Sequence, residues 1–198
     1  MQITKIEQQK RKTNRFNLEI DDEFCCGVDE ALILELDLYK GKNITDKDIQ
    51  TIREADNYKN CLNKAFTLLA IRMNSEIEIR KKLITKYSND SVNKTIDRLK
   101  ELGYVDDNLF VKSWVNSREC SRGVFMLKKE LHQKGIHKDL IDEYFNNRDK
   151  ENEFNNALHL VEKKRWPEMA REERFQKIGN YLSRRGFDYE TIKKVINQ

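Results

Sequence analysis

Two adjacent carboxylates, Asp106 and Asp107, stand between two helical stretches and are the first residues that could do chemistry. Paired carboxylates can hold a divalent cation or exchange protons in acid–base catalysis. The residues before them, Gly103, Tyr104 and Val105, are typical of a helix end followed by a corner. We therefore expect Asp106 or Asp107 to cap the next helix, in preference to a metal-dependent nuclease site.

Other reactive side chains do not form a recognisable constellation. The four cysteines contain no CxxC pair and show no metal-ligand spacing with the three histidines: Cys25, Cys26, Cys61, Cys120, His132, His137 and His159. The sequence contains no GxxxxGK[ST], GxGxxG or HExxH motif. We expect reduced thiols, no metal and no cofactor, and no residue pattern suggests a catalytic site.

Basic residues recur at matching places in three stretches and are the candidate partner-binding residues. They are Arg72, Arg118 and Arg165 on first helices, and Arg80, Lys81, Lys128, Lys129, Lys134, Arg184 and Arg185 on second helices or directly after them. Such side chains can contact carboxylates or phosphates of a partner. The alternative for the first-helix arginines is a half-buried ion pair within their own unit, and for the others a solvated surface.

The charge is unevenly distributed along the chain. The 198 residues carry 38 Lys and Arg against 34 Asp and Glu, a net charge of +4. The first 60 residues have a net charge of −3, so the remainder carries +7. This excess favours an acidic or nucleic-acid partner. No apolar stretch approaches the roughly 20 residues that span a membrane, and the N-terminus lacks the apolar core of a signal peptide, so we expect a cytoplasmic protein without membrane contact.

The N-terminal stretch differs from the rest. Phe16, Leu18 and Ile20 alternate with polar residues, which predicts a half-buried strand within a small antiparallel sheet. The breaks are expected at Lys-Thr-Asn, residues 12–14, and at Asp-Asp, residues 21–22. A short helix capped by Asp29 follows, and then a long helix whose capping box is Thr45 with Asp48.

Residues 65–198 contain a repeated unit of about 47 residues. The arginines of its three first helices are 46 and 47 residues apart. After each second helix come a glycine (absent in the first unit), an aromatic residue or Ile, and an acidic residue that starts another helix. One such three-helix unit cannot bury its apolar face alone, whereas stacked units share a core. We predict a mainly α fold: three tandem three-helix repeats in an elongated curved array, preceded by a small antiparallel β segment and a short helix.

The expected organisation has five segments. Residues 1–44 form the β-rich extension, residues 45–64 the first part of the long connecting helix, and the repeats occupy 65–105, 106–147 and 148–198.

Four stretches of this part of the chain resemble the RecX family, which regulates the RecA recombinase. They are LAIRMNSEIEIRKKL, LKELGYVDDNLFVKSWV, LKKELHQKGI and LSRRGFDYETIKKVI, in the family's order and spacing. The N-terminal extension is similar to that of RecX proteins from Gram-positive bacteria.

The resemblance implies a non-enzymatic, helical regulator with a role in DNA repair and the SOS response. Such a protein binds in the groove of the RecA–DNA filament and limits its extension, ATP hydrolysis and strand exchange. Direct contact with single- or double-stranded DNA is implied for some members. The alternative reading of the residues themselves is a stand-alone nucleic-acid-binding helical repeat protein. In either case we expect a monomer.

Overall fold

The computed structural model describes residues 1–148, 150–164, 166 and 170–198. Within them the chain forms one three-stranded sheet and ten helices. Contacts divide the chain into two compact parts, one formed by Met1–Arg72 with Ile79–Tyr104 and the other by Met73–Glu78 with Val105–Gln198. The prediction of a mainly helical protein with three-helix units behind a small sheet is confirmed.

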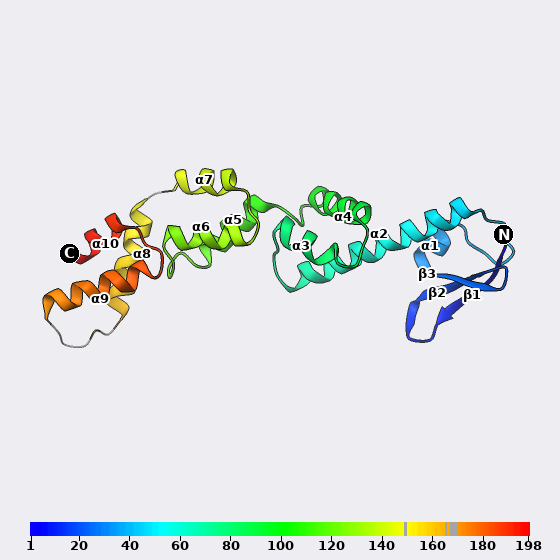
Figure 1. Ribbon diagram of the computed structural model, residues 1–198, viewed down its shortest axis with the longest axis horizontal. Coiled ribbons are helices and arrows are strands. Elements are labelled where there is room, and N and C mark those ends of the chain that lie inside the picture. Colours follow the sequence, from blue (N-terminus) through cyan, green and yellow to red (C-terminus); the bar gives the residue numbers. More distant parts are fainter. Residues whose placement is uncertain (149, 165, 167–169) are drawn as a thin grey trace. The chain divides into compact units, whose positions relative to one another are not determined.

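The sheet has the antiparallel order β1-β2-β3 (Figure 1). Its strands are β1 (Ile3–Gln9), β2 (Lys12–Ile20) and β3 (Glu23–Asp29). The expected break at residues 12–14 is wrong, because β2 begins at Lys12. The Asp-Asp turn is confirmed: Asp21 and Asp22 take φ angles of 49° and 66°, as a two-residue hairpin turn requires.

One face of the sheet builds the N-terminal core. Leu18 is fully buried and packs with residues of all three strands and of the segment that follows: Ile3, Ile20, Val28, Leu38, Ile44 and Ile52. Asp29 caps α1 (Glu30–Glu35), since its carboxylate accepts from the backbone N–H of Ala31 at 3.1 Å. The predicted alternation of β2 therefore places the sheet against α1 and the start of the long helix α2 (Asp46–Ile71).

The long helix begins as the sequence predicts. The Thr45 hydroxyl accepts from the Asp48 backbone N–H, and the Asp48 carboxylate accepts from the Thr45 backbone N–H at 2.8 Å. The rest of the first three-helix unit is α3 (Glu76–Leu83) and α4 (Asn89–Glu101). Apolar side chains at helical spacing close its core, and Leu83, Ile96 and Leu99 are fully buried.

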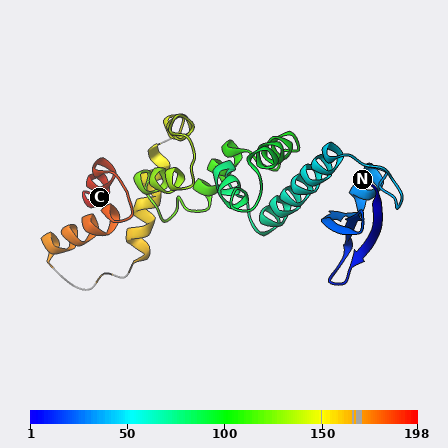
Figure 2. The same cartoon turned by 45° about the vertical axis from the view of Figure 1, so that its right-hand side comes forward.

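The second compact part contains the other two units. The second unit consists of α5 (Asp107–Asn116), α6 (Val124–Gln133) and α7 (Lys138–Asn146), and the third of α8 (Lys150–Lys163), α9 (Arg171–Ser183) and α10 (Tyr189–Ile196). Figure 2 shows α10, in red, lying against α8 and α9. The second core contains Val111, Val115 and Leu131, and the third contains Ala157, Val161 and Leu182.

Candidate partner-binding surfaces

Two cations of the second unit, Arg118 and Lys134, lie against the indole ring of Trp114. The Trp114 Nε1–H donates to the Glu130 carboxylate at 2.9 Å. The Arg118 guanidinium lies 3.5 Å from the centre of the Trp114 ring, and the Lys134 Nζ lies 4.8 Å from it. Arg118 also faces Glu130 at 3.6 Å. The cluster is thus a set of cation–π contacts neutralised by a carboxylate.

Lys134 pairs with a carboxylate other than that of Glu130. Its Nζ lies 2.8 Å from the Glu78 carboxylate, and its backbone carbonyl accepts from the Ser75 hydroxyl at 2.6 Å. Both partners belong to the segment Met73–Glu78 of the same compact part. Arg118 and Lys134 therefore form internal ion pairs in this structure. For Arg118 this is the alternative that the sequence left open for the first-helix arginines, whereas for Lys134 the alternative was a solvated surface.

The other second-helix cations differ in their surroundings. Lys128 pairs with Asp142 at 2.7 Å, and a hydrogen bond from Lys128 holds the pKa of that carboxyl below its ordinary value of 3.8. Arg80 donates to the Asn93 side chain at 2.6 Å. Lys81 and Lys129 are exposed. Lys81 and Lys129 are therefore the more accessible candidates on α3 and α6.

The remaining predicted residues lie at helix ends. Arg72 is exposed at the end of α2, and Arg184 is exposed at the end of α9. Arg185 stacks its guanidinium 3.9 Å from the centre of the Tyr181 ring. Arg165 lies outside the described residues.

The structure also answers the question of the aspartate pair. Asp106 caps α5, since its carboxylate accepts from the backbone N–H groups of Asn108 and Leu109 at 2.7 and 3.1 Å. Asp107 accepts instead from the backbone N–H of Glu76 at 3.0 Å, at the start of α3. Among the described residues, no group of three or more His, Cys, Asp or Glu side chains is arranged to hold a metal ion.

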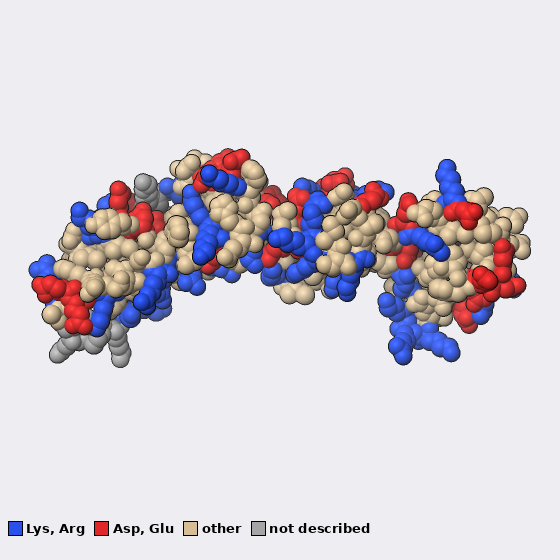
Figure 3. Space-filling model, viewed as in Figure 1, with Lys and Arg blue, Asp and Glu red and all other residues tan. Residues whose placement is uncertain are grey.

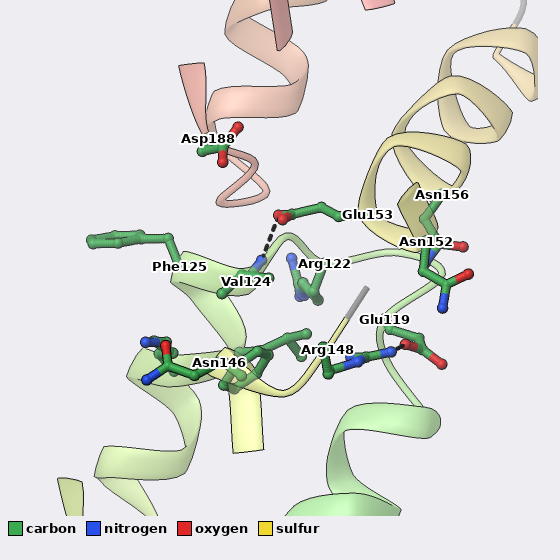
Figure 4. A pocket seen from close by; sticks show the side chains of 13 residues that line it. Glu119, Arg122, Val124, Phe125, Asn146, Arg148, Asn152, Glu153, Asn156 and Asp188 are labelled. Carbon is green, nitrogen blue, oxygen red and sulfur yellow. Dashed lines mark hydrogen bonds and ion pairs between the residues drawn. The ribbon is translucent and has the colours of Figure 1, made fainter. Parts of the chain in front are cut away.

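The same joint recurs one unit further along. Glu153 of α8 accepts from the backbone N–H of Val124 at 2.9 Å, at the start of α6 (Figure 4). Each joint also contains a glycine with positive φ: Gly135 faces Ile77, and Gly186 lies against α6. Within the second compact part, a first-helix carboxylate and a glycine after the second helix thus contact residues at the start of α3 in one joint and of α6 in the other.

Beside this second joint lies a hollow of about 360 Å³. Figure 4 shows Arg148 reaching across it to Glu119, with which it forms an ion pair. Val124, Leu127 and Phe145 also line it, and Phe125 is 70% exposed at its edge. The hollow combines an apolar wall with a charged rim and is large enough for a partner side chain.

Sequence reasoning missed one group of residues in the third unit. Trp166 and Tyr181 meet edge to face with ring centres 5.6 Å apart, and Lys164 lies 4.3 Å from the centre of each ring. The signal available was a tryptophan and a tyrosine among the basic residues of that stretch. Figure 3 shows Lys and Arg side chains gathered beside α9 on the face in view.

Comparison with known families agrees with this architecture. Four family profiles match consecutive stretches: the regulatory protein RecX N-terminal domain over residues 1–45, and the first, second and third RecX three-helix domains over 61–99, 106–144 and 151–196.

Individual relatives extend over almost the whole chain. A regulatory protein RecX of Clostridioides difficile is 34% identical over 99% of this chain and 94% of its own length. That of Bacillus subtilis is 32% identical over 99% of this chain and 76% of its own. A crystal structure of regulatory protein RecX superposes with a TM-score of 0.72 at 25% identity, covering 100% of this chain and 99% of its own. RecX from Lactobacillus salivarius gives a TM-score of 0.66 at 22% identity, covering 72% and 96%, which supports the fold.

The fold and the repeated joints define a protein of three-helix repeats with an N-terminal sheet. The chain belongs to the RecX family of regulatory proteins. The four RecX domain profiles match consecutive stretches of it, and the relative from Clostridioides difficile aligns with 99% of its length. Within the described residues, no helix is long and apolar enough to cross a membrane.

Proposed function

We propose that this protein binds in the groove of the RecA–DNA filament as a monomer in the cytoplasm, without catalytic activity of its own. There it limits filament extension, ATP hydrolysis and strand exchange. The observation that supports this proposal is the ordered presence of all four RecX domains along the chain.

The surface chemistry supports a binding role. A repeat protein presents a series of similar faces, so it can contact successive copies of a regularly repeating partner. Lys81 and Lys129 stand exposed on the second helices of consecutive units and can meet carboxylates of such a partner. Arg118 and Lys134 are bound internally, so we assign them a supporting role in holding that surface.

The test adds increasing amounts of this protein to its cognate RecA, which is assembled on single-stranded DNA. The measured quantity is the rate of ATP hydrolysis by RecA. We expect inhibition at amounts well below one copy per RecA protomer. An unchanged hydrolysis rate across the titration, with filament assembly also unchanged, would refute the proposal.

Charge reversals then locate the contact face. Reversal of Lys128, Lys129 and Lys134 together removes two internal ion pairs as well as surface charge. The cleaner variants are Lys81→Glu and Lys129→Glu, with Lys40→Glu as a control, because Lys40 is exposed in the N-terminal segment. We expect weaker inhibition from the first two and unchanged inhibition from the control. Full inhibition by Lys81→Glu and Lys129→Glu would remove these lysines from the contact face.

A further inference from the structure

The edge strand β3 carries two adjacent cysteines at an irregularity in the sheet. Cys26 pairs with Leu18 of β2 and Phe24 pairs with Glu19, so Cys25 is an extra residue without a partner position on β2. This arrangement is a β-bulge, in which two residues of one strand oppose one residue of its neighbour. The regular alternation of side chains between the two faces of the strand is therefore interrupted at Cys25.

The bulge brings both thiols to the same face. Adjacent residues of a regular strand point to opposite faces. Here Cys25 and Cys26 both pack against the N-terminal core, whereas Phe24 is 66% exposed. The two thiols also interact, since burial and then the neighbouring Cys25 thiol raise the pKa of Cys26. The pair is thus a preformed dithiol on one side of β3.

The pair remains within reach of solvent. Both side chains are only partly buried, in contrast to the fully buried Cys61. The guanidinium of Arg53, an exposed residue of α2, donates to the Cys25 carbonyl at 3.3 Å and lies 3.8 Å from the Cys25 Sγ. A small solute can therefore reach the sulfur atoms beside the Arg53 side chain.

The number and spacing of the thiols select the kind of ligand. Structural zinc sites use four protein ligands. In the described part of the chain, no three His, Cys, Asp or Glu side chains are placed to share a metal ion. A disulfide between adjacent cysteines would be strained, because their Cα atoms are about 3.8 Å apart and disulfide-linked residues usually lie about 4.4–6.8 Å apart. An atom that bridges the two sulfurs lets them stay farther apart than a direct S–S bond does.

We propose that Cys25 and Cys26 form a chelating site for trivalent arsenic compounds. With an arsenical of the form R–As=O, two As–S bonds form and two S–H bonds break, and the oxygen leaves as water with both thiol protons. Arsenic stays trivalent throughout, so the step needs no oxidant or reductant. The second As–S bond forms within one molecule, so the effective concentration of the second thiol is high. The site does not depend on RecA binding, because its residues all lie on β3 and α2.

The test uses the native full-length protein and phenylarsine oxide as the probe, without RecA. Mercaptoethanol is present in excess, because a monothiol displaces arsenic from a single cysteine more readily than from a chelating pair. After unbound probe is removed, we expect mass spectrometry to show one phenylarsenic group per chain, which dithiothreitol should remove. Cys25→Ser and Cys26→Ser should each lose this adduct, whereas Cys61→Ser and Cys120→Ser should keep it.

A relocated cysteine tests whether the bulge sets the geometry. The double variant Phe24→Cys with Cys25→Ser keeps two cysteines, at positions 24 and 26, but places them on opposite faces of β3. It should retain no phenylarsenic group in native buffer and one in urea, where the chain is free to bring both thiols together. The original protein should retain one group in both conditions. Circular dichroism in native buffer checks that each variant is folded.

Three results would overturn the proposal. A native protein without any adduct that resists mercaptoethanol would show that the two thiols do not act together. Retention of the adduct by folded Cys25→Ser or Cys26→Ser would assign it to another pair of cysteines. Equal retention by the folded double variant in native buffer would show that the bulge does not select the pair. None of these results bears on RecA inhibition, so the proposed function is tested separately.

Discussion

The carboxylate of Asp107 accepts a hydrogen bond from the backbone N–H of Glu76, although the two residues are 31 positions apart. This bond reaches the N-terminus of α3, whose first N–H groups have no partner within the helix. The adjacent Asp106 caps its own helix α5. Two neighbouring carboxylates thus serve two different helices, which explains their pairing without catalysis or metal binding.

Replacing either aspartate tests this division of labour. Asp106→Ala and Asp107→Ala should each lower the free energy of unfolding by about 1 kcal/mol, because each removes a helix cap. Asp107→Asn keeps an acceptor oxygen and should lose less. The measurement is urea denaturation followed by circular dichroism. Loss of RecA inhibition with unchanged stability would show instead that the joint contacts the partner.

The local elements were predictable because their signals are local. Thr45 and Asp48 are three residues apart, and their capping box forms as the sequence indicates. The role of Asp107 was not predictable, since its partner lies on another helix. Sequence identified a capping residue there and could not identify the helix that it caps.

The glycines of the joints provide a second prediction. A Cβ at Gly186 would lie 2.5 Å from the backbone nitrogen of Met126, whereas one at Gly103 would meet nothing within 4 Å. Both residues have positive φ, so both alanine variants incur the same backbone strain. Gly186→Ala should therefore be less stable than Gly103→Ala by about 1–3 kcal/mol, the usual range for overpacking. An equal loss of unfolding free energy for the two variants in urea denaturation would show that the joint accommodates the added methyl group without destabilisation.

The partner-binding residues show why surface function was harder to predict. Lys134 and Arg185 directly precede the corresponding glycines Gly135 and Gly186, so they are equivalent cations of two units. In the structure Lys134 faces Glu78, whereas Arg185 faces the Tyr181 ring. Periodicity reveals that the positions are equivalent, but their electrostatic surroundings depend on residues from other helices.

Thiol reactivity gives a third prediction. Burial, followed by the neighbouring thiol of Cys25, raises the pKa of Cys26 to about 12, and burial also raises the pKa of Cys61. Since the thiolate is the nucleophile, both should react slowly with iodoacetamide near neutral pH, whereas the exposed Cys120 should react first. Mass spectrometry of peptides from a time course measures the order. Modification of Cys26 ahead of Cys120 would contradict the burial of its thiol.

The Lys128–Asp142 pair gives a pH-dependent prediction. Hydrogen bonding from Lys128 lowers the pKa of Asp142 below 3.8 in the folded protein. A carboxyl with a lowered folded pKa adds stability above its unfolded pKa, and that stability is lost as the pH falls through the folded value. Lys128→Gln should therefore return the pKa of Asp142 toward its ordinary value. The difference in stability between the original protein and Lys128→Gln should become smaller below about pH 4, because Asp142 is then protonated in both. NMR titration of the Asp142 side chain measures the shift, with Lys129→Gln as the control that leaves the pair intact. An Asp142 pKa that stays equally low in Lys128→Gln would show that another group holds this carboxylate.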